Sequence, residues 1–263
     1  MQIAAQTKAN HLMADILNYI KTNTPLDEMA KARYVKAAKE IPLPEQSQIV
    51  LALVYTASGE KQKAKQYCLQ SLRNFGHSAT FNNCIATLAI NGYSKTLLDI
   101  ASEFIDKLEH VVFVDAFESL IASLPSYEIF YSLLENLTKC KLCDQYRDMI
   151  SRLSVMLKTM IYGNQELHIP LNTYGIVSDF VAQIIEQNGH LVLNQCRITV
   201  SHEGDSISVV YFVEKESEDI LTADLNWDLA EKIIEAKLDT LPLVARFETV
   251  RANMIRVREA YAS

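Results

Sequence analysis

The chain has 263 residues, of which 49% are hydrophobic and 22% are charged, a balance typical of a globular protein with a substantial core. Its formal net charge of −7 disfavours nucleic acid as a partner, because phosphate binding depends on a basic surface. No apolar run reaches the roughly 18 residues that span a bilayer. The N-terminus lacks a secretory signal pattern, and five scattered cysteines indicate reduced thiols, so we expect a cytoplasmic protein.

The charge is unevenly distributed along the chain. Residues 1–164 carry 17 Lys/Arg and 16 Asp/Glu, whereas residues 165–263 carry 8 and 16. A step of this kind often marks a domain boundary. We therefore expect two domains, over residues 1–160 and 165–263.

The segment Leu51–Phe75 predicts two short helices joined at Gly59. Small side chains on both helices would allow close packing, and a glycine accepts the left-handed conformation that ends a helix. The segment resembles a tetratricopeptide repeat at Leu51, Ala52, Tyr55, Gly59 and Ala64. It departs from the repeat pattern at Gln48, Cys68 and Gly76.

Helix breakers recur at a nearly constant interval. Gly59 is preceded 34 residues earlier by Pro25 and followed at steps of 33 by Gly92 and Pro125, each flanked by apolar residues at helical spacing. This period predicts an all-α array of helical hairpins over residues 1–160. An ordinary helical bundle with similar loop spacing is the alternative.

Stacked hairpins present a concave groove that usually holds a peptide segment of a partner protein. The groove would be lined by the first helix of each pair. The candidate partner-binding residues are Gln48, Tyr55, Asn82, Asn83, Asp115 and Glu118. Plain solvated surface is the alternative interpretation of each.

Residues 165–263 show a different pattern. Leu167, Ile169 and Leu171 alternate as in a short strand, and residues 174–189 predict a helix closed by Asn188-Gly189. Two alternating segments on either side of residues 203–205 predict a β-hairpin. Asn226 is expected to cap a helix running to about Leu238, with Trp227 packing on the sheet. Residues 243–250 predict a last strand or the start of a final helix.

This order predicts a small βαββαβ ferredoxin-like domain, so the fold class expected for the whole chain is α+β. The stretch Leu171–Phe212 also resembles an ACT domain, through Gly175 at the turn and Gly189 after the helix. Tyr174 stands where that family usually has proline. The resemblance implies amino-acid binding near Tyr174 and Gly175, and a homodimer formed through the sheet edge. A domain with only a packing role is the alternative.

The sequence contains no recognisable catalytic or metal-binding motif. Cys140-Lys-Leu-Cys143 is a CxxC, but no second pair of ligands has the spacing of a zinc site, so we expect buried, inert thiols. HExxH, GxSxG and a phosphate-binding glycine loop are all absent. We therefore expect no metal, no cofactor and no catalytic residues.

The first functional hypothesis is a non-enzymatic adaptor or chaperone-like scaffold that binds a peptide segment of a partner. The alternative is a regulator that senses an amino acid or similar metabolite through the second domain. An enzyme with its site at the junction of the two halves is a third class.

Overall fold

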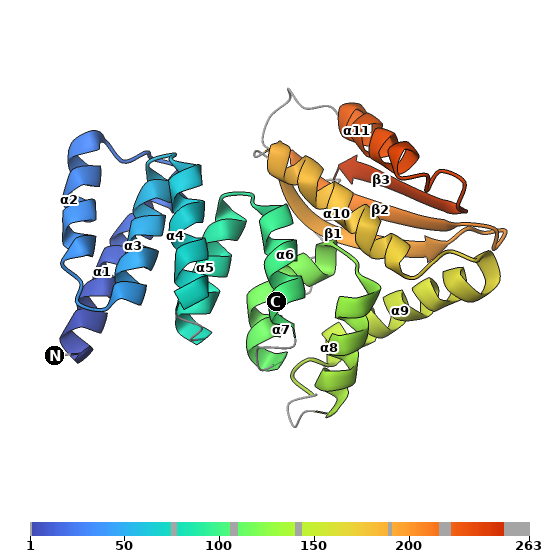
Figure 1. The fold of residues 1–263 in the computed structure, drawn as a ribbon, viewed down its shortest axis with the longest axis horizontal. Helices are drawn as coiled ribbons and strands as arrows, with labels where there is room; N and C mark the ends of the chain where they lie inside the picture. Colours follow the sequence, from blue (N-terminus) through green and yellow to red (C-terminus); the bar gives the residue numbers. More distant parts are fainter. Residues whose placement is uncertain are drawn as a thin grey trace. The chain divides into compact units, whose positions relative to one another are not determined.

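The computed structural model describes residues 2–74, 78–105, 110–139, 144–188, 191–215 and 222–249 (Figure 1). The fold is α+β, with helices throughout and a small mixed sheet near the C-terminus. The elements are α1 (Gln2–Lys21), α2 (Glu28–Lys39), α3 (Pro44–Ala57), α4 (Lys61–Asn74), α5 (Ser78–Ile90), α6 (Ser94–Phe104), α7 (His110–Ser123), α8 (Tyr127–Lys139), α9 (Arg147–Leu167), α10 (Asn172–Gln187), β1 (Leu191–Val200), β2 (Ile207–Lys215), α11 (Thr222–Glu235) and β3 (Leu243–Thr249). Among the described residues, no helix has the length and apolar character needed to cross a membrane.

The chain packs as two compact units, Met1–Tyr93 and Ser94–Ser263, called here the N-terminal and C-terminal units. The junction expected at residues 160–165 falls inside α9. The units differ more strongly in charge than the predicted domains do. The N-terminal unit carries ten Lys/Arg and six Asp/Glu, a net charge of +4, and the C-terminal unit carries 15 and 26, a net charge of −11.

The N-terminal unit is built from successive helices that pack side by side, coloured blue to teal in Figure 1. Helix α3 packs against α1, α2, α4 and α5, as expected where one hairpin stacks on the next. The predicted breakers lie between helices. Gly59 and Gly92 adopt left-handed φ values of 75° and 79°, which glycine accepts without steric cost. The prediction of helices separated by breakers at this period is confirmed for this unit.

Close packing of α3 on α4 depends on small side chains. Ala52 and Ala64 are completely buried, so the two helix backbones can approach each other. The inward face of α4 continues with Cys68, Ser71 and Leu72, which follow Ala64 at helical spacing.

The C-terminal unit contains a three-stranded sheet in the order β1-β2-β3, among the described residues. Strand β1 pairs antiparallel with β2, and β2 pairs parallel with β3. One face of the sheet carries the buried rings of Tyr211 and Phe247, whose centroids lie 6.0 Å apart. Helix α10 covers this face through Ser178, whose hydroxyl lies 3.3 Å from the Tyr211 hydroxyl and donates to the Pro125 carbonyl at 2.7 Å. Complete burial raises the pKa of Tyr211.

The strand predicted at Leu167–Leu171 is wrong. Helix α9 continues to Leu167 and ends at His168, whose φ of 55° is left-handed. The Ile169 N–H then donates to the Gly163 carbonyl at 3.0 Å, which closes the last turn of the helix, and the Ile169 side chain is completely buried. The alternating apolar residues are therefore a helix end and a core contact. The described part of the chain has three strands, and the first strand of the βαββαβ order is absent there.

The helix-capping role predicted for Asn226 is also wrong. Helix α11 begins at Thr222, so Asn226 lies inside it and faces the outer edge of β3. The Phe247 N–H donates to Asn226 Oδ1 at 2.7 Å, and Asn226 Nδ2 donates to the Phe247 carbonyl at 3.1 Å. The side-chain amide thus pairs with the strand as a neighbouring peptide group would. Trp227, expected to pack on the sheet, is 76% exposed because it lies on the opposite side of α11.

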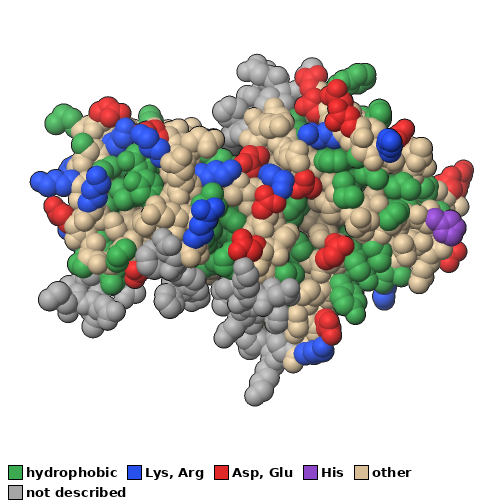
Figure 2. Space-filling model, in the orientation of Figure 1, with side chains coloured by type: hydrophobic (Ala, Val, Ile, Leu, Met, Phe, Trp, Pro, Cys, Tyr) green, Lys and Arg blue, Asp and Glu red, His purple; other side chains and the backbone are tan. Residues whose placement is uncertain are grey.

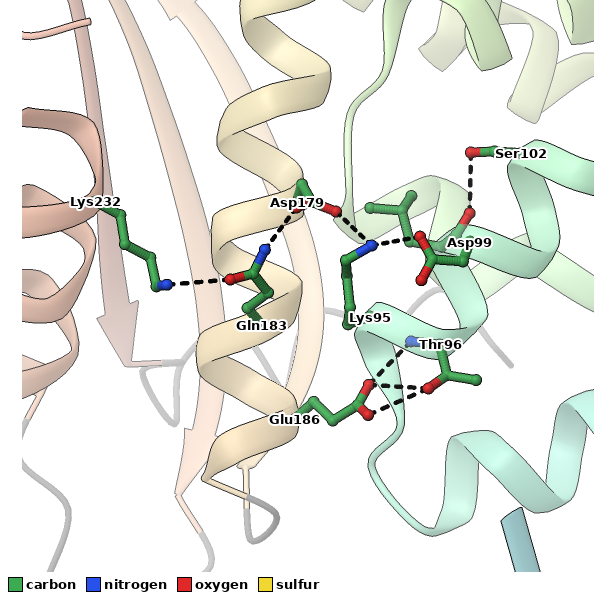
Figure 3. A network of polar contacts seen from close by, with 9 residues as sticks. Lys95, Thr96, Asp99, Ser102, Asp179, Gln183, Glu186 and Lys232 are labelled. Atoms are coloured by element: carbon green, nitrogen blue, oxygen red, sulfur yellow. Dashed lines mark hydrogen bonds and ion pairs between the residues drawn. The ribbon is translucent and has the colours of Figure 1, made fainter. Parts of the chain in front are cut away.

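A polar network holds α6 against α10 (Figure 3). The Glu186 carboxylate accepts the Thr96 backbone N–H at 2.9 Å and the Thr96 hydroxyl at 3.2 Å. Lys95 forms ion pairs with Asp99 and with Asp179, the latter at 2.9 Å. Glu186 therefore satisfies a free N–H in the first turn of α6, from a position 90 residues further along the chain.

Replacing Glu186 should destabilise the C-terminal unit. We expect Glu186→Ala to lower the free energy of unfolding by about 1 kcal/mol, the usual cost of losing a helix N-terminal cap. Glu135→Ala is the matched control, because Glu135 is an exposed carboxylate whose ion pair with Lys139 lies within one helix. Urea denaturation followed by circular dichroism would measure both. Equal effects for the two variants would contradict a capping role for Glu186.

Candidate functional site

The candidate site is a half-open depression on the N-terminal unit. It has a volume of about 340 Å³ and is lined by Tyr55, Lys63, Gln66, Tyr67 and Gln70. Tyr55 comes from α3, and the other four residues come from α4. The rings of Tyr55 and Tyr67 are stacked, with centroids 5.5 Å apart and planes 8° from parallel. Both rings are only partly buried, so they form an aromatic wall that solvent and ligands can reach.

Charged groups border one end of this depression. The Lys63 ammonium lies 5.2 Å from the centre of the Tyr55 ring, within the range of a cation–π interaction. It also forms an ion pair with Glu60, at 2.5 Å, and Glu60 bonds Lys31 of α2 at the same distance. The hydrogen bonds from Lys31 and Lys63 lower the pKa of Glu60, and the carboxylate in turn raises the pKa of each lysine. Glu60 therefore stays ionised between two cations.

The outward face of α4 extends the depression into a longer surface. Residues three and four apart on a helix share a face, so Lys63, Gln66, Tyr67, Gln70 and Arg73 form one stripe. We call these five residues the α4 stripe. Figure 2 shows hydrophobic surface bordered by Lys and Arg side chains over α2 to α4. The stripe combines aromatic, amide and cationic groups and contains no carboxylate.

Of the predicted groove residues, only Tyr55 lies at this depression. Gln48 on α3 and Asn82 on α5 each hold a buried side-chain carbonyl oxygen that has no hydrogen-bond partner among the described residues. Asn83 is exposed on α5. Asp115 and Glu118 belong to α7, in the C-terminal unit, and their side chains lie outside the described part of the structure.

We did not predict Gln66, Tyr67 and Gln70 from the sequence, because the groove was expected on the first helix of each pair, and these residues lie on the second. The signal that could have identified them is the polar stripe itself. Helix α4 has no Asp or Glu, and its exposed residues recur at helical spacing.

The structure does not reproduce the amino-acid site implied by the ACT resemblance. Gly175 lies within the first turn of α10 rather than in a turn between a strand and a helix. Tyr174 is buried in the core, and burial raises the pKa of its hydroxyl to about 12. Gly189, the second glycine of the resemblance, lies outside the described residues. The sensing hypothesis therefore loses the geometry on which it depended.

The thiols that can be described are buried or partly buried. Cys68 and Cys84 come from α4 and α5, and both are almost completely buried. The hydrogen bond from Cys68 to Cys84, together with burial, raises the pKa of the Cys68 thiol. Cys140 and Cys143 lie outside the described residues. Within the described ranges, no group of three or more His, Cys, Asp or Glu side chains is placed to hold a metal ion.

Comparison with known proteins gives no relative from which a role could be transferred. No protein-family model, no curated protein and no solved structure matches the chain. A function for this chain is therefore inferred from its own site.

Proposed function

We propose that this chain is a cytoplasmic, non-enzymatic protein-interaction adaptor, whose N-terminal unit binds a peptide segment of a partner protein. The N-terminal unit would act as a tetratricopeptide-like array of helical hairpins. Its binding surface would be the α4 stripe together with Tyr55, rather than a groove formed by the first helices. The observation that carries the proposal is the stacked, partly exposed Tyr55–Tyr67 pair in an open depression.

This pair has the properties of a binding hot spot. Tyrosine offers a large apolar surface that loses little conformational entropy on binding, together with a polar hydroxyl, and it is enriched among the residues that dominate interface energies. Gln66 and Gln70, which adjoin the rings, can donate to and accept from the backbone of an extended peptide. The depression is too open to exclude water from a reacting centre, which favours binding over catalysis.

The test is affinity capture by the intact chain and by two tyrosine variants. Tyr131 of α8 is the matched control, because it is also stacked on a tyrosine, Tyr127, and is 53% exposed. We expect Tyr67→Ala to weaken retention of the partner about 30-fold, as for an aromatic hot spot worth about 2 kcal/mol, and Tyr131→Ala to leave it unchanged.

A second variant separates lost binding from lost folding. Gln66→Glu changes an exposed side chain of the stripe and should fold normally while weakening retention. Thermal unfolding of every variant would verify the fold. If the stripe variants retained the same partners as the unaltered chain, the proposed site would be wrong.

A further inference from the structure

Most of the Lys and Arg residues of the N-terminal unit lie on two helices, α2 and α4. Each contributes four of the ten Lys/Arg residues of this unit, but α2 also contains Glu28, whereas α4 contains none of the six Asp/Glu residues. Lys63 and Arg73 lie at opposite ends of the α4 stripe, with the glutamines and Tyr67 between them. The stripe is thus cationic at both ends and neutral in the middle.

The carboxylates that form ion pairs at the Lys63 end of the stripe come from outside α4. Glu60 is shared between Lys31 and Lys63, and Glu28 also pairs with Lys31, at 3.2 Å, whereas α4 itself contains no carboxylate. Arg73, at the far end, is exposed. The Glu60 carboxylate lies between the ammonium groups of Lys31 and Lys63, which indicates that this end of the stripe binds carboxylates.

We propose that the partner segment is an acidic linear peptide, with carboxylate side chains at the two ends of the α4 stripe. This inference rests on the proposed function. The ten-residue rise from Lys63 to Arg73 is about 15 Å, which matches four or five residues of extended peptide at about 3.3 Å per residue. The terminal carboxylates pair with Lys63 and Arg73, while Gln66 and Gln70 bond the peptide backbone and the tyrosine rings pack on the segment.

A nucleic acid fits the same cations less well. The N-terminal unit is joined to a C-terminal unit with a net charge of −11, and the whole chain is at −7. The long-range repulsion from a net negative chain grows with the number of phosphates, so it disfavours a long polyanion more than a short acidic segment.

The experiment is a selection of random twelve-residue peptides displayed on phage, performed on the full chain and counter-selected on the Tyr67→Ala variant. We expect the recovered peptides to be enriched in Asp and Glu. A labelled peptide from the selection is then titrated by fluorescence anisotropy. We expect Lys63→Gln and Arg73→Gln each to weaken its binding roughly fivefold, and the double variant to weaken it roughly twenty-fold.

One further variant should have the opposite effect, and another serves as a control. Glu60→Gln removes the competing carboxylate and should tighten peptide binding by roughly two- to fivefold. Lys139→Gln is the matched control, because Lys139 is an exposed lysine paired with Glu135 on α8 and should have no effect. Binding should also weaken between about 50 and 500 mM salt, as screening requires.

The outcomes distinguish the two proposals. If peptides were recovered that depend on Tyr67 but are neutral or basic, the site would stand and the acidic partner would be wrong. If no recovered peptide depended on Tyr67, the proposed function itself would fail. Tighter binding of a labelled single-stranded oligonucleotide than of the selected peptide would overturn the peptide assignment.

Discussion

Substituting alanine for Gly163 should lower the free energy of unfolding by about 1–3 kcal/mol, the usual cost of overpacking a core. A Cβ atom at this position of α9 would lie 2.4 Å from the Tyr174 hydroxyl oxygen and 3.2 Å from Ile207 Cγ1. Tyr174 is 1% exposed, so its ring has little space into which it could move. The clash should therefore exceed the gain of about 1 kcal/mol that alanine normally brings to a helix.

A second substitution should reverse the sign of this effect. Among the described residues packed against that Cβ position, only the Tyr174 hydroxyl comes closer than 3.0 Å to it, and this hydroxyl has no hydrogen-bond partner in the described part of the chain. Tyr174→Phe should thus stabilise the chain by about 1 kcal/mol, because it removes a buried unpaired polar group. In that background, Gly163→Ala should be neutral or stabilising by up to about 1 kcal/mol.

Chemical denaturation of the two single variants and the double variant would measure this coupling. Circular dichroism is the suitable probe, because Trp227, the only tryptophan, is largely exposed and lies on the outer side of α11. Equal costs of Gly163→Ala with and without the Tyr174 hydroxyl would show that the hydroxyl does not restrict this position.

Replacing Asn226 with alanine should destabilise the C-terminal unit by about 2–4 kcal/mol. The substitution removes two hydrogen bonds to Phe247 and leaves a backbone N–H and a carbonyl unpaired at a strand residue that is almost completely buried. Each unpaired buried group costs about 1–3 kcal/mol. The variant should also aggregate more readily, because the edge of β3 then presents unpaired groups to other strands.

Matched variants can show which atoms of Asn226 act. Asn226→Asp keeps the acceptor for the Phe247 N–H, but it removes the donor and places a carboxylate against the Phe247 carbonyl, so it should also destabilise. Asp228→Ala on the same helix changes an exposed residue and should cost less than about 0.5 kcal/mol. If Asn226→Ala had the same free energy of unfolding as the unaltered chain, water would have to replace the two hydrogen bonds of the amide. The hydrogen bonds between Asn226 and Phe247 also oppose the addition of another strand at Phe247. A homodimer formed through the C-terminal unit stays a prediction.

Part of the candidate site could be predicted from sequence. Tyr55 stands out by its place in a repeat-like hairpin. The stacking of Tyr55 on Tyr67 could not be predicted, because it depends on the rotation of α3 against α4, which small buried residues determine only once the helices are packed. The six groove candidates were chosen by helix order, and the structure divides them between two units.

The sequence by itself determined the helices of the N-terminal unit and the hairpin of β1 and β2. Breaker spacing and apolar periodicity are local signals, and glycine at Gly59 or Gly92 marks a helix end wherever the helix packs. Only the tertiary structure decided the roles of residues 167–171 and of Asn226. A short apolar alternation fits a helix end as well as a strand, and a side-chain amide can cap a helix or close a sheet edge. The choice depends on partners distant in sequence, Ile207 near Gly163 and Phe247 beside Asn226, which no local pattern records.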